Sequence, residues 1–140
     1  MEQVVSQPSS APPVDPEPVS LRFTSDIAPP SGNTYYRKFH NHMVLSQKGR
    51  DFKARMLAKC KGLDKVRGPI ALNIRFRFKD ARRRDIDNYF KALLDAFKDV
   101  LFEDDSMVQE ISAVKQISCK SGDGFDMVIS KINTPSDLTL

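Results

Sequence analysis

The stretch IALNIRFRFK, residues 70–79, alternates apolar and polar side chains without interruption. The apolar positions would share one face of a strand: Ile70, Leu72, Ile74, Phe76 and Phe78. The polar positions would share the other face: Asn73, Arg75, Arg77 and Lys79. Because an alternation of period two is typical of a half-buried strand, the stretch predicts a strand with an apolar inner face and a basic outer face.

A helical repeat follows this strand. Apolar residues recur at intervals of three and four positions: Ile86, Tyr89, Phe90, Leu93, Leu94, Phe97 and Leu101. This spacing is typical of an amphipathic helix, which we expect to run from about Asp87 to Leu101 and to pack on the sheet.

Weaker patterns place the remaining elements. They predict a strand at Leu21 to Ile27, a helix at Gln47 to Lys61 between a Ser46 cap and Gly62, a strand near Val108 to Ile117, and a last strand that buries Phe125, Met127 and Ile129. The order is β, α, β, α, β, β. It predicts an α+β fold in which two helices pack on one face of a small mixed sheet.

Composition divides the chain into one domain and two tails. Residues 1–20 hold five of the nine prolines and few large apolar groups, which predicts a disordered tail, and residues 132–140 are interpreted as a C-terminal tail. The domain, residues 21–131, carries all 22 Lys and Arg but only 14 of the 18 acids, a net charge of about +8. Such a charge favours a nucleic-acid partner.

The cysteines and the hydropathy point to an intracellular protein. Cys60 and Cys119 form no metal-binding spacing and are too few for a disulfide scaffold. The sequence shows no secretory signal and no apolar run long enough to span a bilayer, so we expect no membrane association.

The segment SGNTYYRKFHNH, residues 31–42, is interpreted as a loop. Arg37 and Lys38 lie among aromatic residues, so the segment could contact phosphates and stack on bases, or it could be an ordinary surface loop. His40 and His42 are interpreted as loop residues, because the HNH nuclease motif is spread over a whole fold and is not a tripeptide.

Acidic residues lie on both sides of the predicted 87–101 helix. Asp85 and Asp87 precede it, Lys91 follows Asp87 by four positions, and Glu103, Asp104 and Asp105 come after its end. Each acid alone could be a helix cap, a surface ion pair or part of a turn. Converging carboxylates, however, repel one another and need a cation, and ligands that are all oxygen favour Mg²⁺ or Mn²⁺.

A basic run surrounds the first acids. Its members are Arg75, Arg77, Lys79, Arg82, Arg83 and Arg84. Arg37 and Lys38, in the earlier segment 31–42, are further candidates for DNA binding. A divalent ion beside arginines favours a nuclease in which the basic residues bind a DNA strand and the acids hold the ion that cuts it. Two alternatives are a non-catalytic module that binds structured or single-stranded nucleic acid and a phosphohydrolase acting on nucleotides.

The motifs RRRDIDNYFKALLDAF, FEDDSMV and PPSGNTYYR together resemble the RusA-type Holliday junction resolvases over residues 21–131. The resemblance implies a Mg²⁺-dependent homodimeric endonuclease that binds four-way DNA junctions and nicks two opposing strands in recombination and repair. It implies that Asp85, Asp87 and Asp105 are essential acids, that Lys91 is the essential lysine and that Asp104 is a companion metal ligand. The Pro-rich tail and Glu103 depart from the family pattern.

The predicted helix raises a geometric problem for a shared ion. Fifteen residues from Asp87 to Leu101 span about 22 Å, which would place Asp105 at the wrong end to join Asp85 and Asp87. Either the helix is shorter, or a two-fold axis brings Asp105 of one subunit to the first acids of its partner. We therefore predict a metal site completed across a dimer interface.

Overall fold

A mixed sheet forms one layer of the computed structural model, which describes residues 20–132. Its strands are β1 (Ser20–Ser25), β4 (Ile70–Arg77), β5 (Val108–Gln116) and β6 (Gly124–Lys131), in the order β1-β6-β4-β5. β6 pairs antiparallel with β1 and β4, whereas β4 and β5 are parallel. The predicted mixed sheet is confirmed, and β5 is an edge strand.

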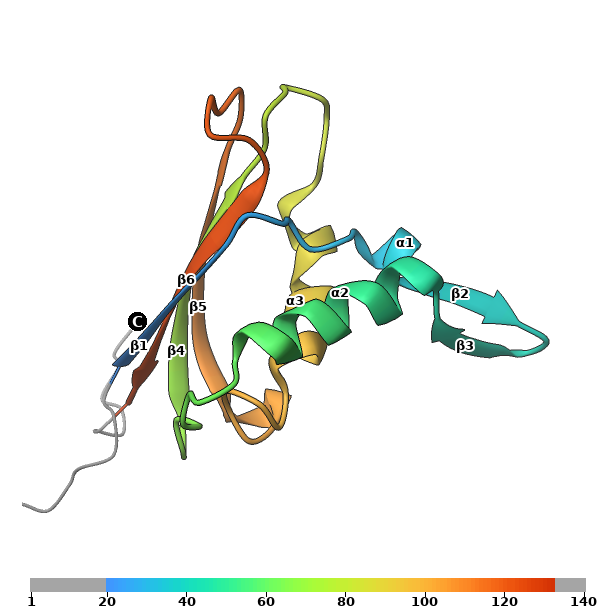
Figure 1. The fold of residues 1–140 in the computed structure, drawn as a ribbon. Coiled ribbons are helices and arrows are strands. Elements are labelled where there is room, and N and C mark those ends of the chain that lie inside the picture. Colours follow the sequence, from blue (N-terminus) through green and yellow to red (C-terminus); the bar gives the residue numbers. More distant parts are fainter. Residues whose placement is uncertain (1–19, 133–140) are drawn as a thin grey trace, which may run out of the picture.

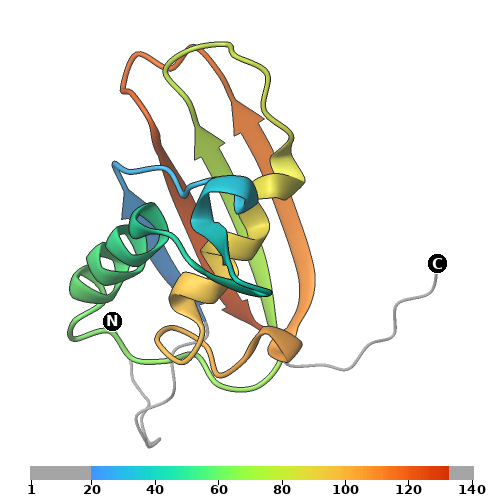
Figure 2. The ribbon, with the colours of Figure 1, turned by 90° about the vertical axis from the view of Figure 1, so that its right-hand side faces the viewer.

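The helices cover one face of this sheet and leave the other open (Figures 1 and 2). They are α1 (Gly32–Tyr35), α2 (Gln47–Lys59) and α3 (Phe90–Phe97), with the short 3₁₀ turns η1 (Ile86–Tyr89) and η2 (Asp105–Met107). The alternation in β4 is confirmed, because its apolar residues are buried beneath the helices with Phe125, Met127 and Ile129 of β6. No helix within residues 20–132 is long and apolar enough to cross a membrane.

The helix after β4 is shorter than its periodicity predicts. α3 ends at Phe97, where Lys98 turns to an extended conformation, and Asp99 has a positive φ of 65°. The Asp99 N–H donates to the Phe102 carbonyl at 2.7 Å, so the chain folds back on itself. Leu101 is nevertheless fully buried. The apolar repeat continued past the helix because this turn also contributes to the core.

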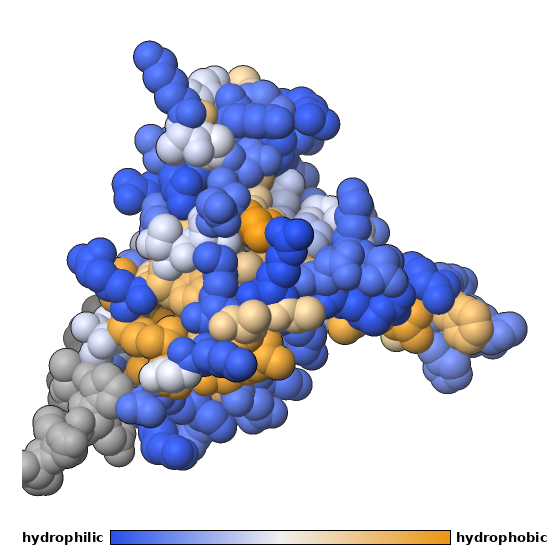
Figure 3. Space-filling model, in the orientation of Figure 1, coloured by the Kyte–Doolittle hydropathy of each residue, from blue (hydrophilic) through white to orange (hydrophobic). Residues whose placement is uncertain are grey.

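The prediction of a loop at residues 31–42 is wrong. The segment instead holds α1 and most of a hairpin, formed by β2 (Tyr36–Phe39) and β3 (His42–Leu45), which projects from the body of the molecule (Figure 1). Polar and apolar residues are interspersed on the surface of this hairpin (Figure 3). The Ser46 cap of α2 is confirmed, since its Oγ accepts from the Gly49 N–H at 3.0 Å. The predicted tails lie almost entirely outside the described residues.

Candidate active site

The first acids lie in the turn that leads from β4 to α3. Asp85 is the N-cap of η1, and its carbonyl accepts from the Asn88 N–H at 3.0 Å. The side chains of Asp85 and Asp87 are exposed, as is that of Lys91 at the start of α3. Because η1 and α3 follow one another directly, Lys91 lies about one turn beyond Asp87.

The segment just before Asp85 is held by its basic side chains. The Arg84 guanidinium lies 4.2 Å from the centre of the Phe78 ring and 2.8 Å from Asp80 Oδ1. Lys115 Nζ of β5 donates to the Arg84 carbonyl at 2.5 Å. The Arg84 hydrogen bond holds the pKa of Asp80 well below its usual range. Asp80 and Lys115, which the sequence reasoning missed, therefore fix the chain next to Asp85.

The second acids lie in η2, just before β5. Asp104 is its N-cap, and Asp104 Oδ2 accepts from the Ser106 N–H at 3.0 Å and from Ser106 Oγ at 2.6 Å. These bonds lower the pKa of Asp104. Asp105 Oδ1 is buried, and no atom of residues 20–132 forms a hydrogen bond with it. Buried polar atoms without a partner are unusual, so this oxygen is available to accept a ligand from outside the described residues, such as a water or a cation.

Tyr36, at the base of the hairpin, lies near this second group. Burial raises the pKa of its hydroxyl, and the negative charges of Asp95 and Asp105 raise it further. The neighbouring Tyr35 is fully buried and donates to Asp95 Oδ2 at 2.5 Å. The base of the hairpin is thus tied to α3, close to the second group of acids.

The two groups of acids lie at opposite ends of β5. In the parallel register Ile70 pairs with Val108 and Arg77 with Gln116, a length of about 23 Å. Asp105 precedes the first end, whereas Lys115 at the other end contacts the residue before Asp85. Figure 2 shows the same separation, with η1 (yellow) and η2 (orange) at opposite ends of β5.

One chain does not assemble the predicted metal site. Within residues 20–132 no group of three or more His, Cys, Asp or Glu side chains could hold a metal ion. The shorter helix does not remove the geometric problem, because η1 and α3 together still span about 20 Å.

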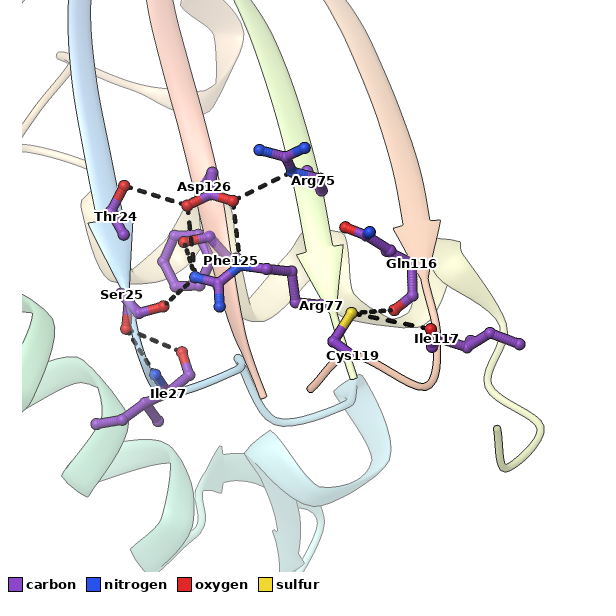
Figure 4. Close-up of polar contacts among 10 residues, drawn as sticks. All are labelled: Thr24, Ser25, Ile27, Arg75, Arg77, Gln116, Ile117, Cys119, Phe125 and Asp126. Atoms are coloured by element: carbon purple, nitrogen blue, oxygen red, sulfur yellow. Dashed lines mark hydrogen bonds and ion pairs between the residues drawn. The ribbon is translucent and has the colours of Figure 1, made fainter. Parts of the chain in front are cut away.

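The arginines on the outer face of β4 form ion pairs with an acid of the same chain (Figure 4). Asp126 Oδ2 lies 3.1 Å from Arg77 Nε and 3.2 Å from Arg75 Nε. Burial alone would raise the pKa of Asp126, but the Arg77 hydrogen bond and charge hold it below its usual range. The Arg77 side chain is only 15% exposed and also donates to the Ser25 carbonyl at 2.9 Å. Arg77 is therefore mainly a structural residue.

The remaining predicted DNA-binding residues do not form one patch. Arg37 and Lys38 are exposed on the hairpin, on the helix-covered side, whereas Arg75 lies on the open face of the sheet (Figure 1). Lys79, Arg82 and Arg83 are exposed in and before the loop that leads to Asp85. Arg82 and Arg83 are thus the basic residues best placed to guide a DNA strand to the first acids.

Arg82 and Arg84 are expected to respond differently to alanine. Arg82→Ala removes only a solvent-exposed ion pair with Asp80, at a side chain 76% exposed, so it should weaken DNA binding and reduce the salt slope by about one with little change in the melting temperature. Arg84→Ala removes a ring contact and an ion pair at a side chain 15% exposed, so the melting temperature should fall by a few degrees. Differential scanning fluorimetry measures the melting temperatures, and a salt titration of DNA binding measures the salt slope. Equal melting temperatures would contradict the structural role of Arg84.

Comparison with known proteins adds independent information. The chain matches the family model described as Endodeoxyribonuclease RusA over residues 26–122. It is 35% identical over 98 residues to the crossover junction endodeoxyribonuclease rusA of Enterobacteria phage 82, covering 67% of this chain and 82% of that protein. The corresponding protein of Escherichia coli (strain K12) gives the same figures. That of Enterobacteria phage HK97 is 31% identical over 105 residues.

Proposed function

The chain belongs to the RusA family of endodeoxyribonucleases, and from this premise we propose that it resolves Holliday junctions. In this proposal a homodimer binds a four-way DNA junction and nicks two opposing strands with Mg²⁺, for which Mn²⁺ can substitute. A two-fold enzyme suits this substrate, because resolution needs two symmetric cuts.

The position of the acids is the observation that carries the proposal. All five predicted catalytic and metal-binding residues fall inside the matched segment 26–122: Asp85, Asp87, Lys91, Asp104 and Asp105. They form two groups at opposite ends of β5, and the second contains a buried oxygen that has no partner in the part of the chain that the structure describes. This arrangement supports a site that one subunit begins and a second subunit completes.

The residues fit a hard divalent cation. Every proposed ligand is a carboxylate: Asp85 and Asp87 from one subunit, with Asp105 and its companion Asp104 from the other. When bound, Mg²⁺ would polarise a phosphoryl oxygen and lower the pKa of a water for attack on phosphorus. The unpartnered Asp105 oxygen is the feature of the chain that best fits such an ion.

Other residues of the chain orient the DNA and stabilise charge. The exposed guanidinium groups of Arg82 and Arg83 would bind the backbone of the strand to be cut, because they lie just before Asp85. Lys91, about one turn beyond Asp87, would stabilise the negative charge that develops on the phosphate. Arg84 and Lys115 would keep Asp85 in place.

A cleavage assay tests the proposal. Purified protein is incubated with a mobile synthetic four-way junction or with matched linear duplex, with Mg²⁺ or with a chelator. We expect paired nicks on opposing strands of the junction, only when Mg²⁺ is present. Tight junction binding without nicking in any divalent ion would instead identify a non-catalytic module for structured nucleic acid.

Lys91→Met is expected to slow cleavage by about a hundredfold while junction binding stays nearly unchanged, because it removes one electrostatic donor near the phosphate. Single-turnover cleavage and electrophoretic binding assays measure the two effects. Lys48→Met, at an exposed lysine of α2, is the matched control and should cleave normally. If binding and cleavage fall together, Lys91 is a plain phosphate contact.

A further inference from the structure

The hairpin formed by β2 and β3 is held firmly at its base. Tyr35, just before β2, is fully buried, and its hydroxyl donates to Asp95 Oδ2 of α3 at 2.5 Å. Gly49 of α2 packs so closely on Tyr35 that a Cβ there would overlap the Tyr35 carbonyl. At the end of β3, the Arg50 guanidinium donates to the Leu45 carbonyl at 2.9 Å. Both strands are therefore fixed where they leave the body of the molecule.

An aromatic ring lies near the tip of this hairpin. Phe39 is the last residue of β2, about 10 Å along the strand from Tyr36, and it is 49% exposed. Phe39 and Arg37 share one face of the hairpin, whereas Lys38 and its cross-strand neighbour Met43 share the other. Apolar residues reach the surface near the end of the projection (Figure 3).

Two neighbours orient the Phe39 ring. The Arg37 guanidinium lies 5.2 Å from the centre of the ring, and the His40 ring meets it edge to face with centroids 4.4 Å apart. These contacts restrict the ring and place a positive charge beside it. An exposed aromatic side chain next to a cation is the combination that stacks on a base of an unpaired strand and binds the adjoining phosphate.

The charge around the hairpin favours nucleic acid over protein as its partner. Residues 27–50 contain four Lys and Arg residues and no Asp or Glu. The apolar surface of a protein partner would have to bury Arg37 and Lys38 without opposite charges, which is costly. The phosphates of a nucleic acid supply those charges, and its bases supply flat apolar surfaces for the ring.

The hairpin also begins beside the candidate active site. α1, which leads into β2, approaches η1 so closely that a Cβ on Gly32 would lie 3.5 Å from the Asn88 carbonyl oxygen. Tyr36, at the start of β2, lies near Asp105. A base bound at the tip of the hairpin would therefore fix the position of its strand relative to the acids.

We propose that Phe39 stacks on an unpaired base at the branch point of a DNA junction, while Arg37 and Lys38 bind the phosphates beside that base. The inference rests on the proposed function and deepens it, because it names the feature of branched DNA that the chain recognises. Exposing a base in a linear duplex costs unstacking and unpairing energy, which is smaller where pairing is already disturbed. Phe39 is thus a residue for selectivity between junction and duplex.

Phe39→Trp reports the stacking directly, because the chain contains no other tryptophan. In a chelator, which prevents metal-dependent cleavage, a saturating immobile four-way junction should quench the fluorescence of the indole, and saturating linear duplex should leave it nearly unchanged. Leu57→Trp, at a 55% exposed residue near the far end of α2, is the matched control and should keep its fluorescence with both DNAs.

Phe39→Ala gives a second measurement. It should weaken binding of the four-way junction by about tenfold and leave the affinity for linear duplex nearly unchanged, because one base loses its stacking partner. Phe39→Tyr keeps an aromatic ring and should bind as the wild-type protein does. Met43→Ala removes an exposed apolar side chain from the opposite face of the same hairpin and should also bind normally. Electrophoretic assays in a chelator measure the affinities.

The outcomes separate this inference from the proposed function. Quenching by the junction alone, with a selective loss of affinity in Phe39→Ala, supports the stacking role even if the wild-type protein fails to nick. A bound junction that leaves the indole unquenched, or a Phe39→Ala variant with wild-type affinity, overturns it even if the wild-type protein nicks junctions. Equal quenching by duplex, or equal losses in Phe39→Ala and Met43→Ala, also overturns it. If the indole fluorescence instead changes with protein concentration in the absence of DNA, the ring packs against a second copy and the inference fails.

Discussion

Asp87→Asn is expected to reduce junction cleavage by on the order of a thousandfold while leaving junction affinity close to that of the wild-type protein. The substitution keeps the shape of an exposed side chain but removes the charge that a divalent ion requires. Single-turnover cleavage of a four-way junction in Mg²⁺ measures the loss, and an electrophoretic assay in a chelator measures binding.

Asp99→Asn is the matched control for this prediction. Asp99 is an exposed acid in the turn after α3, with a positive φ of 65° that asparagine also adopts readily. The variant should fold and cleave as the wild-type protein does. Cleavage by Asp87→Asn at more than about a tenth of the wild-type rate would exclude Asp87 as a metal ligand.

Local features of the fold could be predicted from the sequence. The alternation of residues 70–79 identified β4, because burial of one strand face leaves a pattern of period two. Ser46 identified the start of α2, because its hydroxyl accepts from an N–H only three residues away. The end of α3 was not predictable in this way, since Leu101 is buried from a turn and keeps the apolar repeat.

Long-range features of the candidate site could not be predicted. Arg77 looked like a DNA contact, but strand order places Asp126 of β6 against it, and that pairing joins residues 49 positions apart. The hairpin was missed because its strands are only four residues long and mostly exposed, so burial left no clear alternation. The separation of Asp85 from Asp105 became definite only with the parallel register of β4 and β5.

Asp87→Asn and Asp105→Asn subunits are expected to restore cleavage when they are mixed, although each homodimer alone is inactive. If Asp105 completes the site of its partner, a mixed dimer holds one site with both substitutions and one site with neither. Random exchange makes about half of the dimers mixed, so nicking should recover to about a quarter of the wild-type rate. A site contained within one subunit would give no recovery, because each subunit carries a substitution.

A supercoiled plasmid with an extruded cruciform distinguishes the products of this mixture. Wild-type dimers, with two intact sites, should linearise the plasmid, whereas mixed dimers with one intact site should stop at the nicked circle. A mixture of Asp85→Asn and Asp87→Asn subunits is the matched control: both substitutions lie in the turn before α3, so every site keeps a defect. Recovery in the control as well as in the test mixture, or in neither, would contradict a site shared across the two-fold axis. If cleavage recovers in the test mixture but not in the control mixture, Asp87 of one chain and Asp105 of the other must act on the same phosphate.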